Sequence, residues 1–346
     1  MIRNQHDTSV NESTPCISVI MPAYNCELYI KQAIDSILNQ NFIHFELLIL
    51  DDASTDSTWN VIQEYQDPRI LSFQNEQNLG YLKSCNKLFG LCRGDYITFQ
   101  DADDWSKPDR LGLLYKRLNS DAHLMICGSN CIKVNESNQT YTQKYPNSYT
   151  KILKALESGR TSLFCGASIM FKRELLDLIG SYDSFFNRIG AEDIDWYIRV
   201  VEKFKAENIP EDLYYYRQHS YSISKSNKDP LSHISSDLAY LFHKKRILNP
   251  NKAINLNTKI ILSLFPVKRS GYLEQIIQTS ATQGLLKTCK HYRKDSDLSL
   301  ARQYLYICIA ILTSLIPNKV FIEMSARKRK KRIEYALNKL EKLQSC

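Results

Sequence analysis

Residues 95–105 read Asp-Tyr-Ile-Thr-Phe-Gln-Asp-Ala-Asp-Asp-Trp, an apolar run followed at once by three carboxylates within four positions. The pattern predicts a buried strand that ends in Asp101, Asp103 and Asp104. Ligands of open α/β sheets bind at the carboxyl ends of strands, so we expect these acids at a binding edge. Carboxylates gathered there repel one another unless a cation neutralises them, and oxygen ligands in an incomplete cage suit Mg²⁺ or Mn²⁺.

A purely structural interpretation of this segment is the alternative. Ser106 or Asp104 is a suitable N-cap for a following helix, and Pro108 suits its first turn. An isolated Asp-x-Asp favours that interpretation, and the rest of the chain reverses the preference.

The remaining hydrophobic pattern alternates between strands and helices. It predicts strands at 17–22, 45–50, 69–73, 95–99 and 167–171, and helices at 27–40, 58–65, 79–91, 150–156, 173–179 and 191–203. Residues 135–158 are polar and tyrosine-rich, and we expect them to lie over the site as an insertion outside the sheet. Strands that alternate with helices indicate an α/β fold with a mainly parallel sheet flanked by helices.

Length and composition set the domain organisation. The 346 residues, 43% of them hydrophobic, suffice for a large domain with a sizeable core and an appendage. We expect a polar N-terminal tail at 1–15, a catalytic domain at 16–245 and a basic helical extension at 246–346. The first residues carry no apolar run, so no signal peptide is expected. Ten cysteines without regular spacing then indicate reduced thiols in a cytoplasmic protein.

The positive charge is concentrated in the last third of the chain. Residues 246–346 hold 19 Lys and Arg against 6 Asp and Glu, a net +13, which leaves a net −5 for residues 1–245. The acidic body argues against a nucleic-acid partner. The apolar run at 304–316 is shorter than the about 20 residues that a spanning helix needs, and six consecutive cations follow at 327–332.

These two segments favour attachment to an anionic membrane surface, which would make the protein peripheral at the inner face of the membrane. The alternative is a helical appendage that packs on the catalytic domain or on a second copy of the chain in a homo-oligomer.

Further acid groups and short motifs accompany the first cluster. Asp51 and Asp52 follow the strand at 45–50, and Glu192, Asp193 and Asp195 open the helix at 191–203, where the helix dipole alone also favours acids. The motifs, in chain order, are Pro-Ala-Tyr-Asn at 22–25, Asp-Asp-Ala-Ser-Thr-Asp at 51–56, Asn-Leu-Gly at 78–80, Asp-Ala-Asp-Asp at 101–104, Pro-Asp-Arg at 108–110, Glu-Asp at 192–193 and Tyr-Arg-Gln-His at 216–219.

In these motifs the chain resembles family 2 glycosyltransferases, which have the GT-A fold, over about residues 16–225. The resemblance implies that a nucleotide-sugar is bound, with its base and ribose held by Pro22, Tyr24, Asp52 and Asp101. Asp52 would accept a hydrogen bond from uracil. Asp103 would ligate Mn²⁺ or Mg²⁺ on the diphosphate, His219 would complete that site, and Asp193 would be the general base.

The chain departs from the family pattern at two places. The family often has Gly where Ala53 stands, and an Arg-Asn pair where Cys85 and Asn86 stand. Lys83 would then take the phosphate-binding role of the missing Arg. Glu192, Asp195 and Trp196 are further candidates for a pocket that holds the acceptor or the sugar.

The predicted function is that of an inverting, metal-dependent hexosyl- or N-acetylhexosaminyl-transferase. Its donor is expected to be a UDP-sugar, and its acceptor a saccharide or lipid-linked saccharide in bacterial surface polysaccharide synthesis. One alternative is a nucleotidyltransferase on a similar sheet, which usually carries a Gly-rich basic stretch after the first strand, whereas Pro-Ala-Tyr-Asn stands at 22–25. The other is a non-catalytic nucleotide-sugar-binding or scaffold protein, which would not need to keep Asp103 and Asp193.

Overall fold

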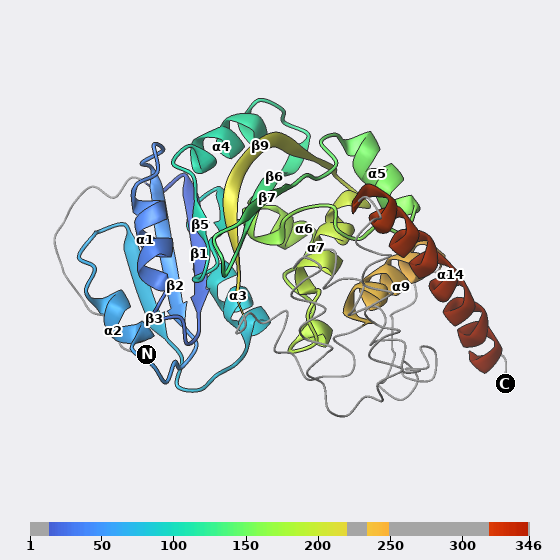
Figure 1. Ribbon diagram of the computed structural model, residues 1–346, viewed down its shortest axis with the longest axis horizontal. Coiled ribbons are helices and arrows are strands. Elements are labelled where there is room, and N and C mark those ends of the chain that lie inside the picture. Colours follow the sequence, from blue (N-terminus) through green and yellow to red (C-terminus); the bar gives the residue numbers. More distant parts are fainter. Residues whose placement is uncertain (1–13, 220–233, 249–317, 345–346) are drawn as a thin grey trace. The chain divides into compact units, whose positions relative to one another are not determined.

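The computed structural model describes residues 14–219, 234–248 and 318–344. The strands are β1 (Ile17–Ala23), β2 (Phe45–Asp51), β3 (Ile70–Gln74), β4 (Tyr96–Phe99), β5 (Trp105–Ser106), β6 (Leu124–Asn135), β7 (Thr140–Gln143), β8 (Met170–Lys172) and β9 (Lys205–Gln218). The helices are α1 (Ile30–Leu38), α2 (Thr58–Gln63), α3 (Tyr81–Phe89), α4 (Arg110–Asn119), α5 (Tyr149–Glu157), α6 (Leu175–Ile179), α7 (Glu192–Val201), α9 (Ser235–Leu248) and α14 (Asn318–Gln344) (Figure 1).

The strands form one mixed sheet in the order β3-β2-β1-β4-β8-β6-β9-β5, with β7 beside β6. The first four strands are mutually parallel, and β8 joins β4 in antiparallel orientation. Each of the helices α1, α2 and α3 lies in the chain between two of these parallel strands, as a parallel sheet requires. The predicted α/β fold is therefore confirmed.

The strand register brings the predicted acid groups to one edge of the sheet. Ala23 at the end of β1 pairs with Asp51 at the end of β2, and Ile20 of β1 pairs with Phe99 of β4. Asp101 follows Phe99 by two residues, so the loops after β1, β2 and β4 begin beside one another.

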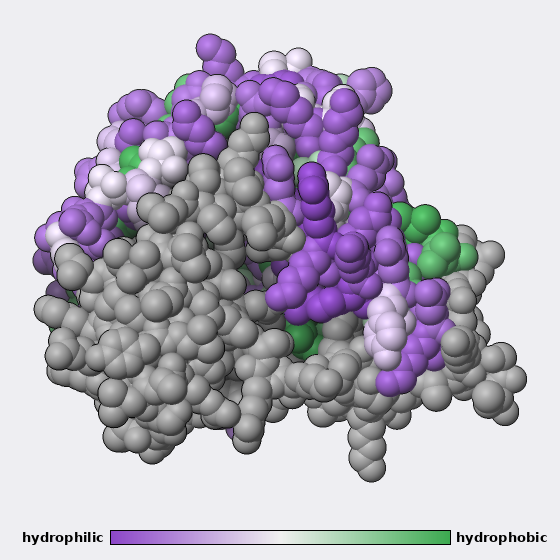
Figure 2. All heavy atoms as spheres, turned by 45° about the vertical axis from the view of Figure 1, so that its right-hand side comes forward, coloured by the Kyte–Doolittle hydropathy of each residue, from purple (hydrophilic) through white to green (hydrophobic). Residues whose placement is uncertain are grey.

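Contacts divide the chain into two compact units, Met1–Leu156 with Thr161–Ala239, and Glu157–Arg160 with Tyr240–Cys346. The sheet and all the predicted site residues belong to the first unit. In the second unit, α14 buries Ala326, Ile333 and Ala336 along one side. Figure 2 shows strongly hydrophilic residues gathered over α14. No helix in the described ranges is both long and apolar enough to cross a membrane, and the run at 304–316 lies outside those ranges.

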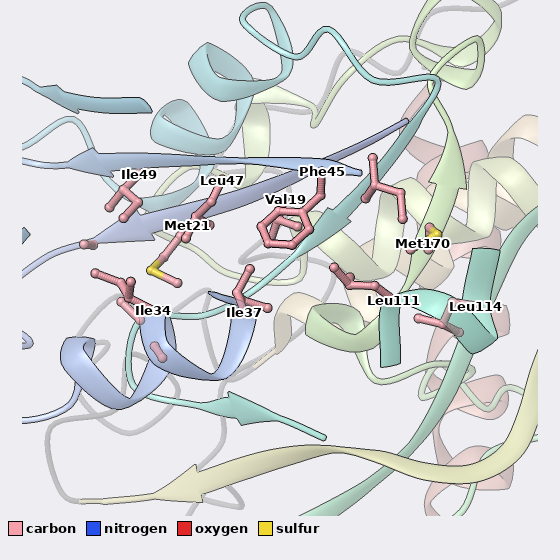
Figure 3. Packing of buried hydrophobic residues seen from close by; sticks show 14 of the residues in the cluster. Val19, Met21, Ile34, Ile37, Phe45, Leu47, Ile49, Leu111, Leu114 and Met170 are labelled. Atoms are coloured by element: carbon pink, nitrogen blue, oxygen red, sulfur yellow. The ribbon is translucent and has the colours of Figure 1, made fainter. Parts of the chain in front are cut away.

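The core of the first unit explains why β1 and β2 are mostly apolar. Alternate residues of a strand point to opposite faces of a sheet. On one face, Val19, Met21, Phe45, Leu47 and Ile49 pack against Ile34 and Ile37 of α1 and Leu111 and Leu114 of α4 (Figure 3). On the other face, Ile20 and Leu48 are also fully buried, and α3 contacts β1 and β2. A sheet covered on both faces favours apolar residues at most strand positions. The buried polar pair Ser18 and Glu46 is an exception, in which the Ser18 hydroxyl donates to the Glu46 carboxylate (2.6 Å).

Three predictions about local structure are corrected. Residues 135–158 do not all lie outside the sheet, because β7 pairs with β6 in antiparallel orientation. The strand expected at 167–171 begins only at Met170, after a 3₁₀ turn at Gly166–Ser168. The capping alternative for the acid cluster is wrong, because β5 follows the cluster and α4 begins at Arg110 with Asp109 as its N-cap residue.

Candidate active site

The loops that follow β1 and β2 are hydrogen-bonded to each other. The backbone N–H of Asn25 donates to Oγ of Ser54 (2.9 Å), and the Asn25 side chain accepts from the N–H of Thr55 (2.8 Å). Asn25 and Ala53 both have left-handed backbones, with φ of 48° and 59°. That conformation has no steric cost for glycine, which accounts for the Gly that the family often has where Ala53 stands.

Asp52 connects β2 to the Asn-Leu-Gly segment. Its Oδ1 accepts hydrogen bonds from Nδ2 of Asn75 (2.7 Å) and the N–H of Leu79 (2.9 Å), and its Oδ2 accepts from the N–H of Gly80 (2.8 Å). The side chain is almost fully buried. These contacts fix the loop before α3, and the expectation that Asp52 also reads a nucleotide base stays a prediction.

Two of the three acids after β4 are held by tyrosine or backbone groups. Oδ1 of Asp101 accepts a hydrogen bond from the Tyr81 hydroxyl (2.9 Å). Burial and the nearby Asp103 carboxylate raise the pKa of Asp101 to about 7. Asp104 is buried, accepts from the backbone N–H of Arg217 (2.6 Å), and has its pKa raised by burial.

Asp103 meets His219, a residue 116 positions away in the chain. Nε2 of His219 lies 2.8 Å from Oδ2 of Asp103, and the Asp103 side chain keeps 31% of its surface exposed. The imidazole is packed on the ring of Tyr29, with centroids 4.9 Å apart. Its buried Nδ1 has no hydrogen-bond partner among the described residues. The structure thus brings together the two side chains predicted to bind a metal ion.

The Asp103–His219 pair fits part of a coordination shell for Mn²⁺ or Mg²⁺. Adjacent ligands of an octahedral ion with bonds of about 2.1 Å lie about 3.0 Å apart, close to the observed 2.8 Å between Oδ2 and Nε2. No group of three His, Cys, Asp or Glu side chains within the described ranges is arranged to hold a metal ion. In the described part of the chain this pair could supply two ligands, and such ions usually take their others from substrate phosphates and water.

Glu192 and Asp193 open α7 after a strained loop. Ala191, directly before them, has a left-handed backbone with φ of 69°. Burial raises the pKa of Asp193, and burial together with the Asp193 charge raises the pKa of Glu192 to about 8. A raised pKa brings a carboxylate closer to the range in which it can accept a proton at neutral pH.

Gly166 lies against the Asp193 carboxylate. A Cβ atom at Gly166 would stand 2.2 Å from Oδ2 of Asp193 and 3.1 Å from its Cγ. The clash falls on the end of a side chain and not on backbone, so the carboxylate can move away without unfolding the chain.

We expect Gly166→Ala to keep the melting temperature within about 2 °C and to lower turnover about 10-fold or more, because misplacing a catalytic group by about 1 Å is costly. Thermal unfolding and steady-state kinetics test this. Gly90→Ala is the matched control, since a Cβ there would meet only the Lys87 carbonyl at 3.6 Å. Turnover equal to that of the wild type would show that the Asp193 position is not critical.

Asp195 and Trp196 point into the protein. Asp195 is 1% exposed and pairs with Nε of Arg199 (2.9 Å). Trp196 is 0% exposed, donates to the Gly180 carbonyl (2.9 Å) and packs on Phe171. Both side chains have internal partners and almost no exposed surface, so burial favours Glu192 over them for the acceptor or sugar pocket, and that role stays a prediction.

The other predicted donor-binding residues lie on different elements around the carboxyl edge. Pro22 is buried within β1, whereas the Tyr24 side chain beyond it is 48% exposed. Lys83 is exposed in the first turn of α3. Their roles stay predictions.

Residue-level sequence analysis assigned no role to Arg217, Tyr29, Trp105 or Tyr81. Arg217 donates to the backbone carbonyl of Asp103 (2.8 Å) and lies between the rings of Tyr29 and Trp105. The available signal was the position of Arg217 within the Tyr-Arg-Gln-His motif, two residues before His219.

Comparison with known proteins settles the family. The family model described as glycosyl transferase family 2 matches residues 18–180. Bacillus subtilis EpsE, whose name describes a glycosyltransferase, is 30% identical over 276 residues, which are 70% of this chain and 98% of that protein. The chain belongs to glycosyl transferase family 2. This family 2 protein is thus a glycosyltransferase, as the motifs predicted, and the nucleotidyltransferase alternative is excluded.

Other matches extend the comparison. Escherichia coli WfaP, named as a UDP-Glc:α-D-GlcNAc-diphosphoundecaprenol β-1,3-glucosyltransferase, is 28% identical over 217 residues, 60% of this chain and 79% of that protein. S. aureus TarS 1–349 in complex with UDP-GlcNAc has a TM-score of 0.51 at 16% identity, over 91% of each chain. The Pyrobaculum calidifontis mannosyltransferase PcManGT, solved with GDP-Man and Mn²⁺, has a TM-score of 0.53 at 17% identity, over 94% of this chain and 87% of that one. These two structures confirm the predicted GT-A fold.

Proposed function

We propose that this glycosyltransferase moves a sugar, with inversion, from a UDP-sugar to a hydroxyl of a saccharide or lipid-linked saccharide in surface polysaccharide synthesis. The observation that carries the metal-dependent part is the 2.8 Å contact between Asp103 and His219 at the carboxyl edge of the sheet. The names of WfaP and of the TarS complex support a UDP-linked donor, and the name of WfaP supports a lipid-linked acceptor.

In this proposal Asp103 and His219 would hold Mn²⁺ or Mg²⁺ at the donor diphosphate. When bound, the ion acts as a Lewis acid that offsets the negative charge of the departing nucleotide. Asp101, Pro22, Tyr24 and Asp52 orient the nucleoside, and Lys83 adds positive charge near the phosphates.

Asp193 removes the proton from the acceptor hydroxyl. Inversion needs a single base beside the attacking hydroxyl and no protein nucleophile, and we assign that role to Asp193, whose pKa is raised by burial. Glu192, whose pKa is about 8, stays largely protonated at neutral pH and can donate a hydrogen bond to the acceptor or the sugar.

A donor and acceptor screen tests the proposal. The full chain is incubated with UDP-glucose, UDP-GlcNAc or GDP-mannose, with Mn²⁺, Mg²⁺ or EDTA, and with undecaprenyl-diphosphate sugars or free oligosaccharides. Release of the nucleoside diphosphate and mass spectrometry of the acceptor are the readouts. We expect transfer from one UDP-sugar only when divalent metal is present. Transfer that is unaffected by EDTA would refute the metal role, and nucleotide binding without any turnover would support a non-catalytic protein.

We further propose that α14 holds the enzyme on an anionic membrane at its inner face. Arg327, Lys328, Lys330 and Lys331 are exposed on the helix surface. Arg329, on another side of the helix, is partly buried, and its Nη1 donates to the Gly159 carbonyl within the same unit (2.9 Å). The helix therefore has a packed side and a cationic side, and only the cationic side is available to lipid headgroups.

Reversing three of these charges, Arg327→Glu, Lys330→Glu and Lys331→Glu, is expected to weaken binding to phosphatidylglycerol-containing vesicles at least about 100-fold. Each cation near an anionic surface contributes about 1 kcal/mol, and about 3 kcal/mol corresponds to about 100-fold. Co-sedimentation at low and high salt is the measurement, because salt screens the attraction.

The control reverses three exposed lysines elsewhere, Lys116, Lys154 and Lys203, and so changes the net charge equally. It should keep most vesicle binding. A wild-type chain that stays in the supernatant at low salt would refute the membrane role and leave packing, or association with a second copy, as the role of the extension.

A further inference from the structure

A column of five side chains, each in contact with the next, leads from the sheet edge to His219. The ring of Tyr215 lies 4.8 Å from that of Trp105 and nearly parallel to it. The Arg217 guanidinium carbon is 4.6 Å from the Trp105 ring centre and 4.7 Å from that of Tyr29. Tyr29 in turn contacts the His219 imidazole, with centroids 4.9 Å apart. Arg217 is the central member of this column, and β5, β9 and the segment before α1 all contribute to it.

Arg217 also makes the hydrogen bonds that join β9 to the acid cluster. Its Nε donates to the backbone carbonyl of Asp103 (2.8 Å), and its backbone N–H donates to Oδ1 of Asp104 (2.6 Å). One of its terminal amino groups donates to the side-chain oxygen of Gln32 on α1. A single residue thus fixes the Asp103 peptide from one side and lies two positions from His219.

These contacts are not those of an ordinary ion pair. Among the described residues, the guanidinium of Arg217 contacts a carbonyl, an amide and two aromatic rings, and forms no salt bridge to a carboxylate. A planar guanidinium can stack on two rings and donate from Nε in its own plane, whereas a lysine ammonium can do neither in this geometry. The contacts at position 217 therefore require the planar guanidinium of arginine and not only a positive charge.

We propose that Arg217 is a positioning residue that sets the distance between Asp103 and His219 and so determines how tightly the pair binds a divalent cation. This inference rests on the metal role proposed above for Asp103 and His219. Arg217 fixes the main chain of the first ligand directly and the imidazole of the second through Tyr29. Groups that orient metal ligands without touching the ion typically contribute 10- to 100-fold to metal affinity.

The test compares Arg217→Lys with the wild-type full chain in Mn²⁺ binding with UDP present, followed by electron paramagnetic resonance of free Mn²⁺. We expect affinity to fall about 10-fold or more. In metal-free protein, hydrogen exchange should become faster in a peptide covering 213–219, because the residue 217 side chain no longer ties the end of β9 to the Asp103 carbonyl and to Gln32. Exchange should stay unchanged in β1. Arg69→Lys is the matched control, since Arg69 lies 4.6 Å over the Phe45 ring and pairs with Asp67 at the start of β3. It should leave Mn²⁺ affinity unchanged.

Tyr29→Leu supplies a second variant if Arg217→Lys folds poorly, because it breaks the same column between Arg217 and His219, and it should weaken Mn²⁺ binding in the same way. Mn²⁺ affinity within two-fold of the wild type, in protein that is merely less stable to heat, would overturn the positioning role and leave the metal role intact. Wild-type protein that binds no Mn²⁺ with UDP would overturn the metal role, and this inference with it.

Discussion

Replacing Asp193 with Asn is expected to lower turnover about 100-fold or more, while the affinity for donor stays within about two-fold. The amide keeps the size of the side chain and removes its ability to accept a proton, which is the contribution of a general base. The proposed role of Asp193 is toward the acceptor hydroxyl and not toward the nucleotide, so the loss should appear in kcat and not in donor binding.

The pH dependence gives an independent readout of the same role. A base acts only when deprotonated, and burial raises the pKa of Asp193 above that of an ordinary carboxyl. Activity should therefore rise with pH through a range above the usual carboxyl value of about 4, and Asp193→Asn should remove that rise. Asp177→Asn, at an exposed acid on α6, is the control and should keep both turnover and pH profile. Nearly wild-type turnover in Asp193→Asn would move the base to Glu192.

The parallel strands β1 and β2 could be predicted from the sequence because helices cover both faces of that part of the sheet. Every residue of β1 and β2 is buried and most of them are apolar, so the local sequence reveals both strands. The part of the sheet around β6 could not be predicted from local sequence in the same way. β6 carries Gly128, Ser129 and Asn130 in its middle, and Asn130 donates to the Pro210 carbonyl. Only the folded neighbours make such polar positions compatible with a strand.

The site shows the same division between local and long-range information. Acids that directly follow β2 and β4 are placed at one edge by topology alone, so their proximity was predictable. The pairing of Asp103 with His219 spans 116 residues and was suggested by family resemblance, not by spacing. The stacking of Arg217 on Tyr29 and Trp105 depends on side chains from three separate segments, and no local pattern encodes it.

Replacing Asp103 with Ala is expected to have the largest effect, a fall in transfer of at least about 1,000-fold, because a Lewis-acid metal contributes several kcal/mol to the transition state. Mn²⁺ should no longer strengthen UDP binding, whereas UDP binding in EDTA should match that of the wild type. His219→Ala should weaken Mn²⁺ binding less, since one carboxylate ligand remains.

Thermal unfolding of Asp103→Ala distinguishes loss of a metal ligand from loss of the folded structure. The Asp103 charge helps to raise the pKa of Asp101, so the two carboxylates repel each other when no metal is bound. Metal-free Asp103→Ala loses this repulsion together with the contact to His219, so it should melt near the wild-type temperature at pH 8 and yet gain nothing from Mn²⁺ with UDP. Asp95→Ala removes an 80% exposed carboxylate just before the start of β4 and should behave as wild type in both assays. An Asp103→Ala protein that is stabilised by Mn²⁺ and UDP as strongly as the wild type would show that the ion binds elsewhere.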